Sequence, residues 1–356
     1  MKRIGGLWDG LISYSNLSEA ARRAALGKRS RRDVAAYLLN LENEIAVLRR
    51  ELLEGSYQPG PYREFRIVDP KPRMISAAPF RDRVVHHALT QVLEPIFETR
   101  FSPNSYACRK GMGTRAALER AKQGAAVYGY ALKADVRKYF ASIDHEILMA
   151  RLERTIKCKP TLDLAARIVA GSNAQEDIVA YFPGDDLFTP ADRRRGLPLG
   201  NQTSQFFANL YLDALDQFVD RTLKPPCWVR YVDDILVFDA SKERLREVKA
   251  AVEEKLAEVR LRLHEGKSRA YRCQDGVGFL GWLLFPGRTR LARRNVVGFR
   301  RRLGEMEHAL TRRETDFKEV RRRVYSWIGH AAAGDTWRLR ERLFEEFRVA
   351  VAKQAA

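Results

Sequence analysis

The chain has 356 residues, of which 45% are hydrophobic, 10% aromatic and 31% charged, as in a globular protein with several domains or one large lobed domain. Lys and Arg total 64 against 45 Asp and Glu, and the resulting net charge of +19 indicates a polyanionic partner, because phosphate neutralisation dominates the affinity of proteins for nucleic acids. A membrane surface is the competing partner, but no apolar run approaches the ~20 residues of a transmembrane helix, and the first residues lack the apolar core of a signal peptide.

Residues 1–60 predict a helical N-terminal extension. Apolar side chains recur at three- and four-residue spacing from Arg32 to Leu53, which predicts helical structure such as a packing helix pair, and Gly55–Pro61 ends the region. A packing role explains most of this segment.

A strand, a Pro-bounded turn and a second strand are expected over Tyr62–Ser76, with Lys71 and Arg73 at the tip. These cations could hold a triphosphate, although any solvated turn carries such residues. A helix then begins near Pro79. It contains His86 and His87, which are adjacent, cannot share a helix face and are interpreted as structural.

The next strand, Tyr128–Val136, carries Asp135 at its end, where a carboxylate that closes a buried strand requires a partner. A structural role is enough to explain Asp144, because this residue can cap a helix over His145–Ile156. Residues 171–195 are polar and irregular and predict an insertion loop whose acidic pair, Asp185–Asp186, is solvated.

Gly196–Tyr211 begins as a Gly/Pro loop, which allows backbone to approach a ligand closely, and a helix is expected from about Ser204 to Val219. This arrangement is compatible with a nucleotide cradle, but many ordinary connections have the same form.

Residues 227–239 place the acidic pair Asp233–Asp234 between two apolar runs, a pattern that predicts a β-hairpin. The alternatives are a hairpin tip with two solvated carboxylates and a metal site. Adjacent like charges at the ends of such apolar strands repel each other unless a cation lies between them, and Mg²⁺ is commonly held by carboxylates plus substrate phosphates.

The remaining chain predicts a helix over Ser241–Leu261, a strand over Leu261–His264 that leads to Lys267, and a hairpin over Gly276–Phe285. The segment from Arg288 to Arg323 has helical periodicity and contains 13 Lys and Arg residues but only five Asp and Glu residues. A solvated basic face would explain this pattern, but together with the overall charge the pattern favours a helical lobe that grips a nucleic-acid backbone.

Four dispersed cysteines without a Cys-x-x-Cys pair indicate neither a zinc site nor a disulfide framework and fit a reducing cytoplasm.

Several of these features stand in the order and at the spacing of the motifs of reverse transcriptases, and the chain resembles that family over about residues 60–290. The features are Asp135 at a strand end, Phe140 five residues later, the Gly200 loop, Tyr231–Asp234, Lys267 and Gly278–Trp282.

The resemblance implies an α+β right-hand polymerase with fingers, palm and thumb, in which an antiparallel palm sheet is backed by helices. The expected domains are the helical extension 1–60, fingers and palm 61–286 with the insertion loop at about 171–195, and a basic helical thumb 287–356. No room is expected after the thumb for an RNase H, endonuclease or maturase domain, which disfavours a full group II intron protein.

The implied chemistry is metal-dependent. Asp135 and Asp233, with Asp234 assisting and Val136 beside them, would hold two Mg²⁺ ions about 3.5–4 Å apart, and Mn²⁺ would be a substitute. One ion would activate the primer 3′-hydroxyl and the other would clamp the triphosphate. Lys267 matches the lysine that protonates or neutralises the leaving group.

The implied substrate contacts follow the same motifs. Lys71 and Arg73 match the fingers residues that contact the triphosphate, Phe140 matches the aromatic gate that excludes a ribose 2′-hydroxyl, and Gly200 and Gln205 complete the dNTP site. The implied template and primer contacts are Leu199, Ser204, Tyr231, the primer grip Gly278, Phe279, Leu280, Gly281 and Trp282, and Arg301.

One motif departs from the common pattern. Most reverse transcriptases have Gln-Gly and then Ser-Pro in the loop-helix motif, whereas this chain has Leu199–Gly200 and then Ser204–Gln205. This form resembles the reverse transcriptases of diversity-generating retroelements, which copy a template-repeat RNA, misincorporate at adenines and work with an accessory variability protein. The implied partners are template RNA, a DNA or RNA primer, the cDNA product, dNTPs and that accessory protein, without a membrane, in the cytoplasm of a bacterium or encoded by a phage.

Three alternatives remain at this point. A defence-associated or otherwise domesticated bacterial reverse transcriptase shares the catalytic motifs. A viral-type RNA-dependent RNA polymerase is disfavoured by Phe140. A non-catalytic RNA-binding scaffold is disfavoured because all three acidic positions are present.

Overall fold

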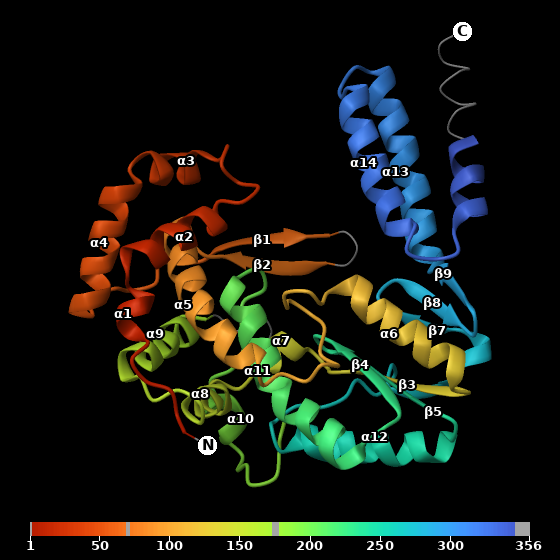
Figure 1. Cartoon of the computed structure of the whole chain (residues 1–356), viewed down its shortest axis with the longest axis horizontal. Helices are drawn as coiled ribbons and strands as arrows, with labels where there is room; N and C mark the ends of the chain where they lie inside the picture. Colours follow the sequence, from red (N-terminus) through yellow and green to blue (C-terminus); the bar gives the residue numbers. More distant parts are fainter. Residues whose placement is uncertain (1, 69–71, 173–177, 346–356) are drawn as a thin grey trace. The chain divides into compact units, whose positions relative to one another are not determined.

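The structure is a computed structural model that describes residues 2–68, 72–172 and 178–345 (Figure 1). Its chain divides into two compact units. The first comprises residues 1–109, 135–224 and 250–265, and the second comprises residues 110–134, 225–249 and 266–356. Helix α12, Lys242–Ala257, contributes residues to both units.

Helices dominate the first unit. They are α1 (Trp8–Leu11), α2 (Tyr14–Ala24), α3 (Arg32–Leu39), α4 (Leu41–Glu54), α5 (Phe80–Glu98), α7 (Tyr139–Ser142), α8 (His145–Glu153), α9 (Lys159–Ala170), α10 (Thr189–Asp192), α11 (Gln202–Phe218) and the π-helical turn η1 (Val219–Leu223). The helical structure expected over Arg32–Leu53 consists of two helices, because Asn40 leaves the helical conformation (φ −112°, ψ 29°) and separates α3 from α4. Gly55 ends α4 with φ +73°, a left-handed conformation that glycine adopts without steric cost.

The core of this unit forms where α5 packs between α2 and α11. Leu89 and Phe207 are among its buried side chains, and Phe97 meets Phe206 edge-on with ring centroids 5.6 Å apart. Burial lowers the pKa of His86 to about 3 and that of His87 to about 4. Both rings are therefore neutral at pH 7, in agreement with the structural role expected for them.

An antiparallel hairpin, β1 (Arg63–Ile67) and β2 (Arg73–Ala77), precedes α5, as the sequence predicts. Arg73 begins β2 opposite Ile67 and is exposed, whereas Lys71 lies outside the described residues. The hairpin is visible beside α5 in Figure 1.

The second unit is built on a four-stranded sheet with the order β4-β5-β3-β6. Its strands are β3 (Tyr130–Asp135), β4 (Cys227–Tyr231), β5 (Asp234–Asp239) and β6 (Arg269–Arg272), and the pairs β4–β5 and β3–β6 are antiparallel. Helix α6 (Thr114–Val127) packs on β4 and β5. This approach requires Gly124, since a Cβ there would lie 2.4 Å from the Phe238 ring. The strand expected over Leu261–His264 is wrong: Leu263 makes only an isolated bridge to Val136.

A second antiparallel sheet and a helical hairpin complete this unit. The sheet consists of β7 (Val277–Phe279), β8 (Trp282–Phe285) and β9 (Arg288–Leu291), and the 3₁₀ turn η2 (Cys273–Asp275) precedes it. Helices α13 (Arg293–Thr311) and α14 (Phe317–Ala331) lie side by side in Figure 1. The rings of Phe299 and Trp327 stack between them with their centroids 3.7 Å apart.

These elements make a mixed fold of helices and antiparallel sheets, as expected for the fold class. The basic segment after β9 is helical, as its periodicity predicts. Across the described ranges, no helix has both the length and the apolar content that crossing a bilayer requires.

Candidate active site

The acidic pair lies at the turn of the β4–β5 hairpin. Tyr231 pairs with Asp234, so Val232 and Asp233 form the two-residue connection. Val232 has φ +57°, a left-handed conformation that costs a β-branched residue about 1–3 kcal/mol. Beneath the turn, the guanidinium of Arg230 is completely buried and donates a hydrogen bond to the Val232 carbonyl at 3.0 Å. The surrounding sheet therefore fixes this turn in a conformation that the local sequence disfavours.

Asp234 is half-buried and faces a cation from the neighbouring strand. Its Oδ1 lies 3.7 Å from the Nζ of Lys133, which also donates to the Gly278 carbonyl at 2.9 Å. Lys133 precedes Asp135 by two positions, so the two side chains point to the same face of β3. The sequence motifs did not identify Lys133 as a candidate site residue. Its position on the same strand face as Asp135 is the signal that could have identified it.

Hard carboxylate oxygens at these strand ends are the donor type that Mg²⁺ prefers. Within the described part of the chain, no group of three or more His, Cys, Asp or Glu side chains converges as a metal site would. Asp135 ends β3, Val136 follows it in a bridge to Leu263, and the Asp135 carbonyl accepts a hydrogen bond from His264 N at 2.7 Å.

The Gly278–Trp282 segment forms the turn between β7 and β8. Leu280 and Gly281 have φ +46° and +86°, which is the pattern of a type I′ hairpin turn. Phe279 and Trp282 are each 1% exposed, so their rings belong to the core of the second unit. Asn295 donates to the Gly281 carbonyl at 3.0 Å and joins the turn to α13.

The other predicted residues of this unit lie at its surface or edge. The Tyr231 hydroxyl is 3.0 Å from the Thr114 hydroxyl. Lys267 is exposed in the turn before β6. Arg301 is exposed on α13 and pairs with Glu305 at 3.5 Å.

In the first unit, the loop before α11 docks on β2. The Leu199 carbonyl accepts a hydrogen bond from Ser76 N at 3.3 Å. Gly200 has φ +110°, and a Cβ at this position would lie 3.1 Å from Ile75, so both conformation and space favour glycine. Ser204 is buried, and Gln205 is exposed.

Gly200 and Gln205, two of the predicted dNTP contacts, line the same cavity of about 230 Å³. Arg23, Lys28 and Arg83 also line it. Phe140 lies elsewhere in this unit on α7, half-buried, with its ring centroid 5.6 Å from that of Tyr139, and its carbonyl accepts a hydrogen bond from Leu197 N at 2.8 Å.

The insertion loop differs from its expected solvated state. The side chains of Asp185 and Arg193 are each 5% exposed and form an ion pair. Asp186 is exposed and accepts hydrogen bonds from the Phe188 and Thr189 amides at 2.9 and 2.7 Å. The prediction of a solvated pair is therefore wrong for Asp185, because the Arg193 side chain turns inward and pairs with it.

Asp144 connects this loop to two other segments. It caps α8 as predicted, accepting hydrogen bonds from the Glu146 and Ile147 amides at 3.0 and 3.2 Å. Its carboxylate, 1% exposed, also lies 3.4 Å from Arg193 Nε and 2.7 Å from Arg260 Nη1. The hydrogen bond to Asp144 raises the pKa of Arg260 above its usual range. Sequence reasoning identified the cap but not the two ion pairs.

Comparison with known proteins shows what the chain is similar to. A family model described as "Reverse transcriptase (RNA-dependent DNA polymerase)" matches residues 68–284. Protein YkfC of Escherichia coli (strain K12) is 27% identical over 298 residues, which cover 71% of this chain and 74% of that protein.

Two further relatives are matched over shorter segments. Group II intron-encoded protein LtrA of Lactococcus lactis subsp. cremoris is 25% identical over 181 residues, or 50% of this chain and 28% of that protein. Nuclear intron maturase 1, mitochondrial, of Arabidopsis thaliana is 34% identical over 85 residues, or 24% of this chain and 12% of that protein. The family model covers more than half of the chain, including the hairpin that carries Asp233 and Asp234, and the chain therefore belongs to the reverse transcriptase family.

Proposed function

We propose that this protein is an active RNA-directed DNA polymerase with a right-hand architecture. In this proposal the β1–β2 hairpin with α5 belongs to the fingers, the four-stranded sheet is the palm, and α13 with α14 forms the thumb. The observation that carries the proposal is the Asp233–Asp234 pair at a strained turn, on a strand adjacent in the sheet to the strand that ends in Asp135.

Each of the predicted site residues has its own role in the proposed reaction. Asp135, Asp233 and Asp234 would hold two Mg²⁺ ions, which when bound supply charge neutralisation for the attacking and leaving oxygens. Lys133 limits the negative charge around Asp234, because its ammonium lies 3.7 Å from Oδ1. Arg73 and Lys71 would orient the triphosphate of the incoming dNTP, and Lys267, exposed beside β6, would neutralise the leaving group. Phosphoryl transfer mainly requires such positioning.

A substitution of Phe140 tests the sugar specificity of this site. If its ring excludes a ribose 2′-hydroxyl, Phe140→Ala lowers the preference for dNTPs over NTPs by roughly 10- to 100-fold. Single-nucleotide primer extension on an RNA template with Mg²⁺ measures kcat/KM for both substrates. Phe317→Ala, which truncates an exposed aromatic ring on α14, should leave the ratio unchanged. An unchanged ratio for Phe140→Ala would remove the gate assignment.

We further propose that the enzyme is the error-prone polymerase of a diversity-generating retroelement, with an accessory variability protein as partner. The support is the Leu199–Gly200 form of the loop before α11. Leu199 is half-buried beside Gly200, and its carbonyl accepts the hydrogen bond from Ser76 N that docks the loop on β2.

Leu199→Gln should therefore reduce misincorporation opposite template adenine. A shift of about 1.4 kcal/mol in discrimination corresponds to about a tenfold change in the error frequency. Deep sequencing of cDNA copied from one RNA template measures this frequency, with errors at the other template bases as the internal reference. Leu199→Met keeps an apolar side chain and should retain the wild-type spectrum. Identical spectra for wild type and Leu199→Gln would argue against the retroelement subtype without affecting the polymerase assignment.

A further inference from the structure

A small cavity in the first unit is lined by an unusual concentration of cations. Its volume is about 120 Å³, and all of its lining residues belong to this unit. The cationic side chains are Arg137, Lys138, Arg193, Arg195, Arg260 and Arg262, and none of the described residues that line the cavity is acidic. None of the catalytic, nucleotide, template or primer contacts predicted from the sequence lines it.

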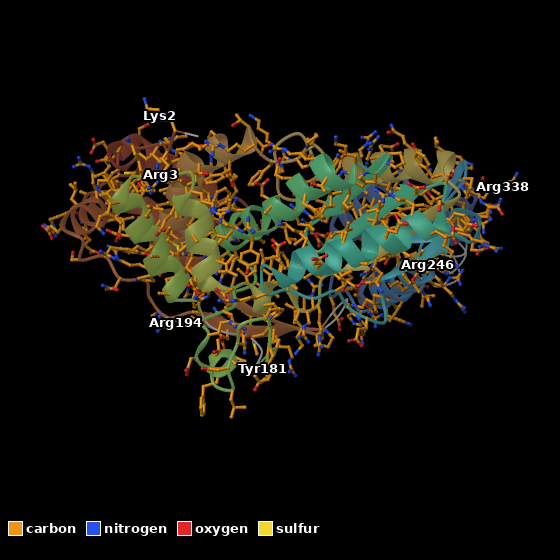
Figure 2. All side chains as sticks on the ribbon, turned by 90° about the horizontal axis from the view of Figure 1, so that it is seen from below. Lys2, Arg3, Tyr181, Arg194, Arg246 and Arg338 are labelled. Carbon is orange, nitrogen blue, oxygen red and sulfur yellow. The ribbon has the colours of Figure 1, made fainter. Side chains whose placement is uncertain are left out.

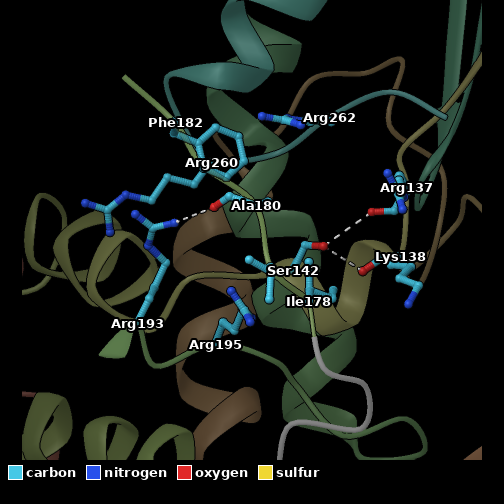
Figure 3. Close-up of a pocket in the computed structure, with 11 residues that line it drawn as sticks. Arg137, Lys138, Ser142, Ile178, Ala180, Phe182, Arg193, Arg195, Arg260 and Arg262 are labelled. Atoms are coloured by element: carbon cyan, nitrogen blue, oxygen red, sulfur yellow. Dashed lines mark hydrogen bonds between the residues drawn. The ribbon is translucent and has the colours of Figure 1, made fainter. Parts of the chain in front are cut away.

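Three segments distant in the sequence build the cavity (Figure 3). The segment after β3 contributes Arg137 and Lys138, and residues 260–262 run alongside it, since Arg137 N donates to the Arg262 carbonyl at 2.8 Å. The insertion loop supplies Ile178, Val179, Ala180, Phe182, Arg193 and Arg195. Tyr181 and Arg194 mark this loop at the surface in Figure 2. Backbone bonds from His145 N to the Arg194 carbonyl, at 3.1 Å, and from Gly196 N to Ile143 fix the loop on α8 and the turn before it.

The aromatic ring of Phe182 orders two of the guanidinium groups. The Cζ atoms of Arg262 and Arg193 lie 5.1 and 5.7 Å from its centroid. Arg262 also donates to the Tyr181 carbonyl at 2.6 Å. Stacking and hydrogen bonding therefore hold these groups in place before any ligand arrives, which lowers the conformational entropy lost on binding.

Two of the arginines that line the cavity add positive charge beyond the ion pairs around it. Arg193 and Arg260 are paired with the surrounding acids Asp144, Asp185 and Glu146. Arg137 and Arg262 place two further guanidinium groups on the same wall. Like charges in so small a space repel each other, and a bound anion relieves that repulsion.

We propose that this cavity is a phosphate-binding site, additional to the catalytic carboxylates and the dNTP contacts, that holds one phosphate group of a nucleic-acid strand or of a nucleotide. Guanidinium groups suit this ligand because their planar forks match phosphate oxygens. The site positions its ligand next to the segment that follows Asp135. The proposal rests on the family's nucleic-acid chemistry but not on catalysis, because it concerns binding alone.

The test removes Arg137 and Arg262 together from the full-length protein. The double variant Arg137→Ala/Arg262→Ala is compared with Arg49→Ala/Arg50→Ala, which removes two exposed arginines from α4 and causes the same change in net charge. Fluorescence anisotropy with a labelled single-stranded RNA, repeated across a salt series, measures strand binding. Calorimetry with inorganic tripolyphosphate, without RNA, measures binding of a free phosphate chain.

For a strand phosphate, RNA affinity falls about tenfold in the Arg137/Arg262 variant, and the slope of log K against log salt decreases by roughly 1 to 1.5. For a nucleotide phosphate, tripolyphosphate binding is weakened instead. Arg137→Lys/Arg262→Lys should retain most of the affinity because it keeps both charges. Equal binding by the Arg137/Arg262 and Arg49/Arg50 variants in both assays overturns the proposal. A catalytically inactive protein that still shows the selective loss would contradict the proposed polymerase while supporting this site.

Discussion

Asp233→Ala is expected to reduce RNA-templated DNA synthesis by at least about a thousandfold, while RNA affinity stays within twofold. Asp233 occupies the two-residue turn between β4 and β5, where its carboxylate would help to hold Mg²⁺, the ion that would neutralise charge on the reacting phosphate. Primer extension measures synthesis, and fluorescence anisotropy measures RNA binding. Electron paramagnetic resonance of Mn²⁺ titrated into the protein gives a readout independent of turnover, and the variant should bind fewer ions.

Asp275→Asn is the matched control, because it removes an exposed negative charge from the same unit. It should retain wild-type synthesis. Retained synthesis in Asp233→Ala would refute the metal assignment. If the wild-type protein itself bound RNA without extending a primer, the chain would be an RNA-binding scaffold that keeps the fold of the family.

Asp144→Ala is expected to destabilise the first unit by about 3–5 kcal/mol. Removing the carboxylate leaves the buried Arg193 with one fewer partner. It also removes the acceptor of the hydrogen bond that Arg260 donates at 2.7 Å, and it uncaps α8. Because the chain has two units, a single denaturation midpoint does not isolate this effect. Hydrogen exchange followed by mass spectrometry resolves it, and peptides from α8 should lose protection.

Ser13→Ala separates the capping contribution from the ion pairs. Ser13 caps α2 in the same unit by accepting a hydrogen bond from Asn16 N at 3.2 Å, and it takes part in no ion pair. Its loss should cost about 1 kcal/mol. Similar losses of protection in the two variants would show that the pairs of Asp144 with Arg193 and Arg260 contribute little.

Local patterns predicted most of the elements. The hairpins at residues 63–77, 227–239 and 277–285 and the ends of β3 follow from alternating apolar residues and turn residues. The prediction failed at Leu261–His264. There an apolar alternation found only one bridging partner, because β6 rather than this segment pairs with β3.

Candidate site residues were predictable where a motif is contiguous and unpredictable where contacts join distant segments. Asp233 and Asp234 were evident from two apolar runs around an acidic pair. The strand period places Lys133 on the same face as Asp135, but its contact with Asp234 was not evident, because that contact depends on β3 lying beside β5, which the order of the chain does not reveal. The pairing of Asp144 with Arg260 spans 116 positions and depends in the same way on tertiary structure.

The conformation of Val232 has a consequence for which substitutions this turn can accept. A glycine there would adopt φ +57° readily and relieve the strain, yet it would also allow the turn to sample other conformations. The valine keeps Asp233 in a narrow range of orientations, at a cost to stability that Arg230 and the apolar strands offset. The position therefore sets the stability of the turn against a fixed orientation of the Asp233 carboxylate.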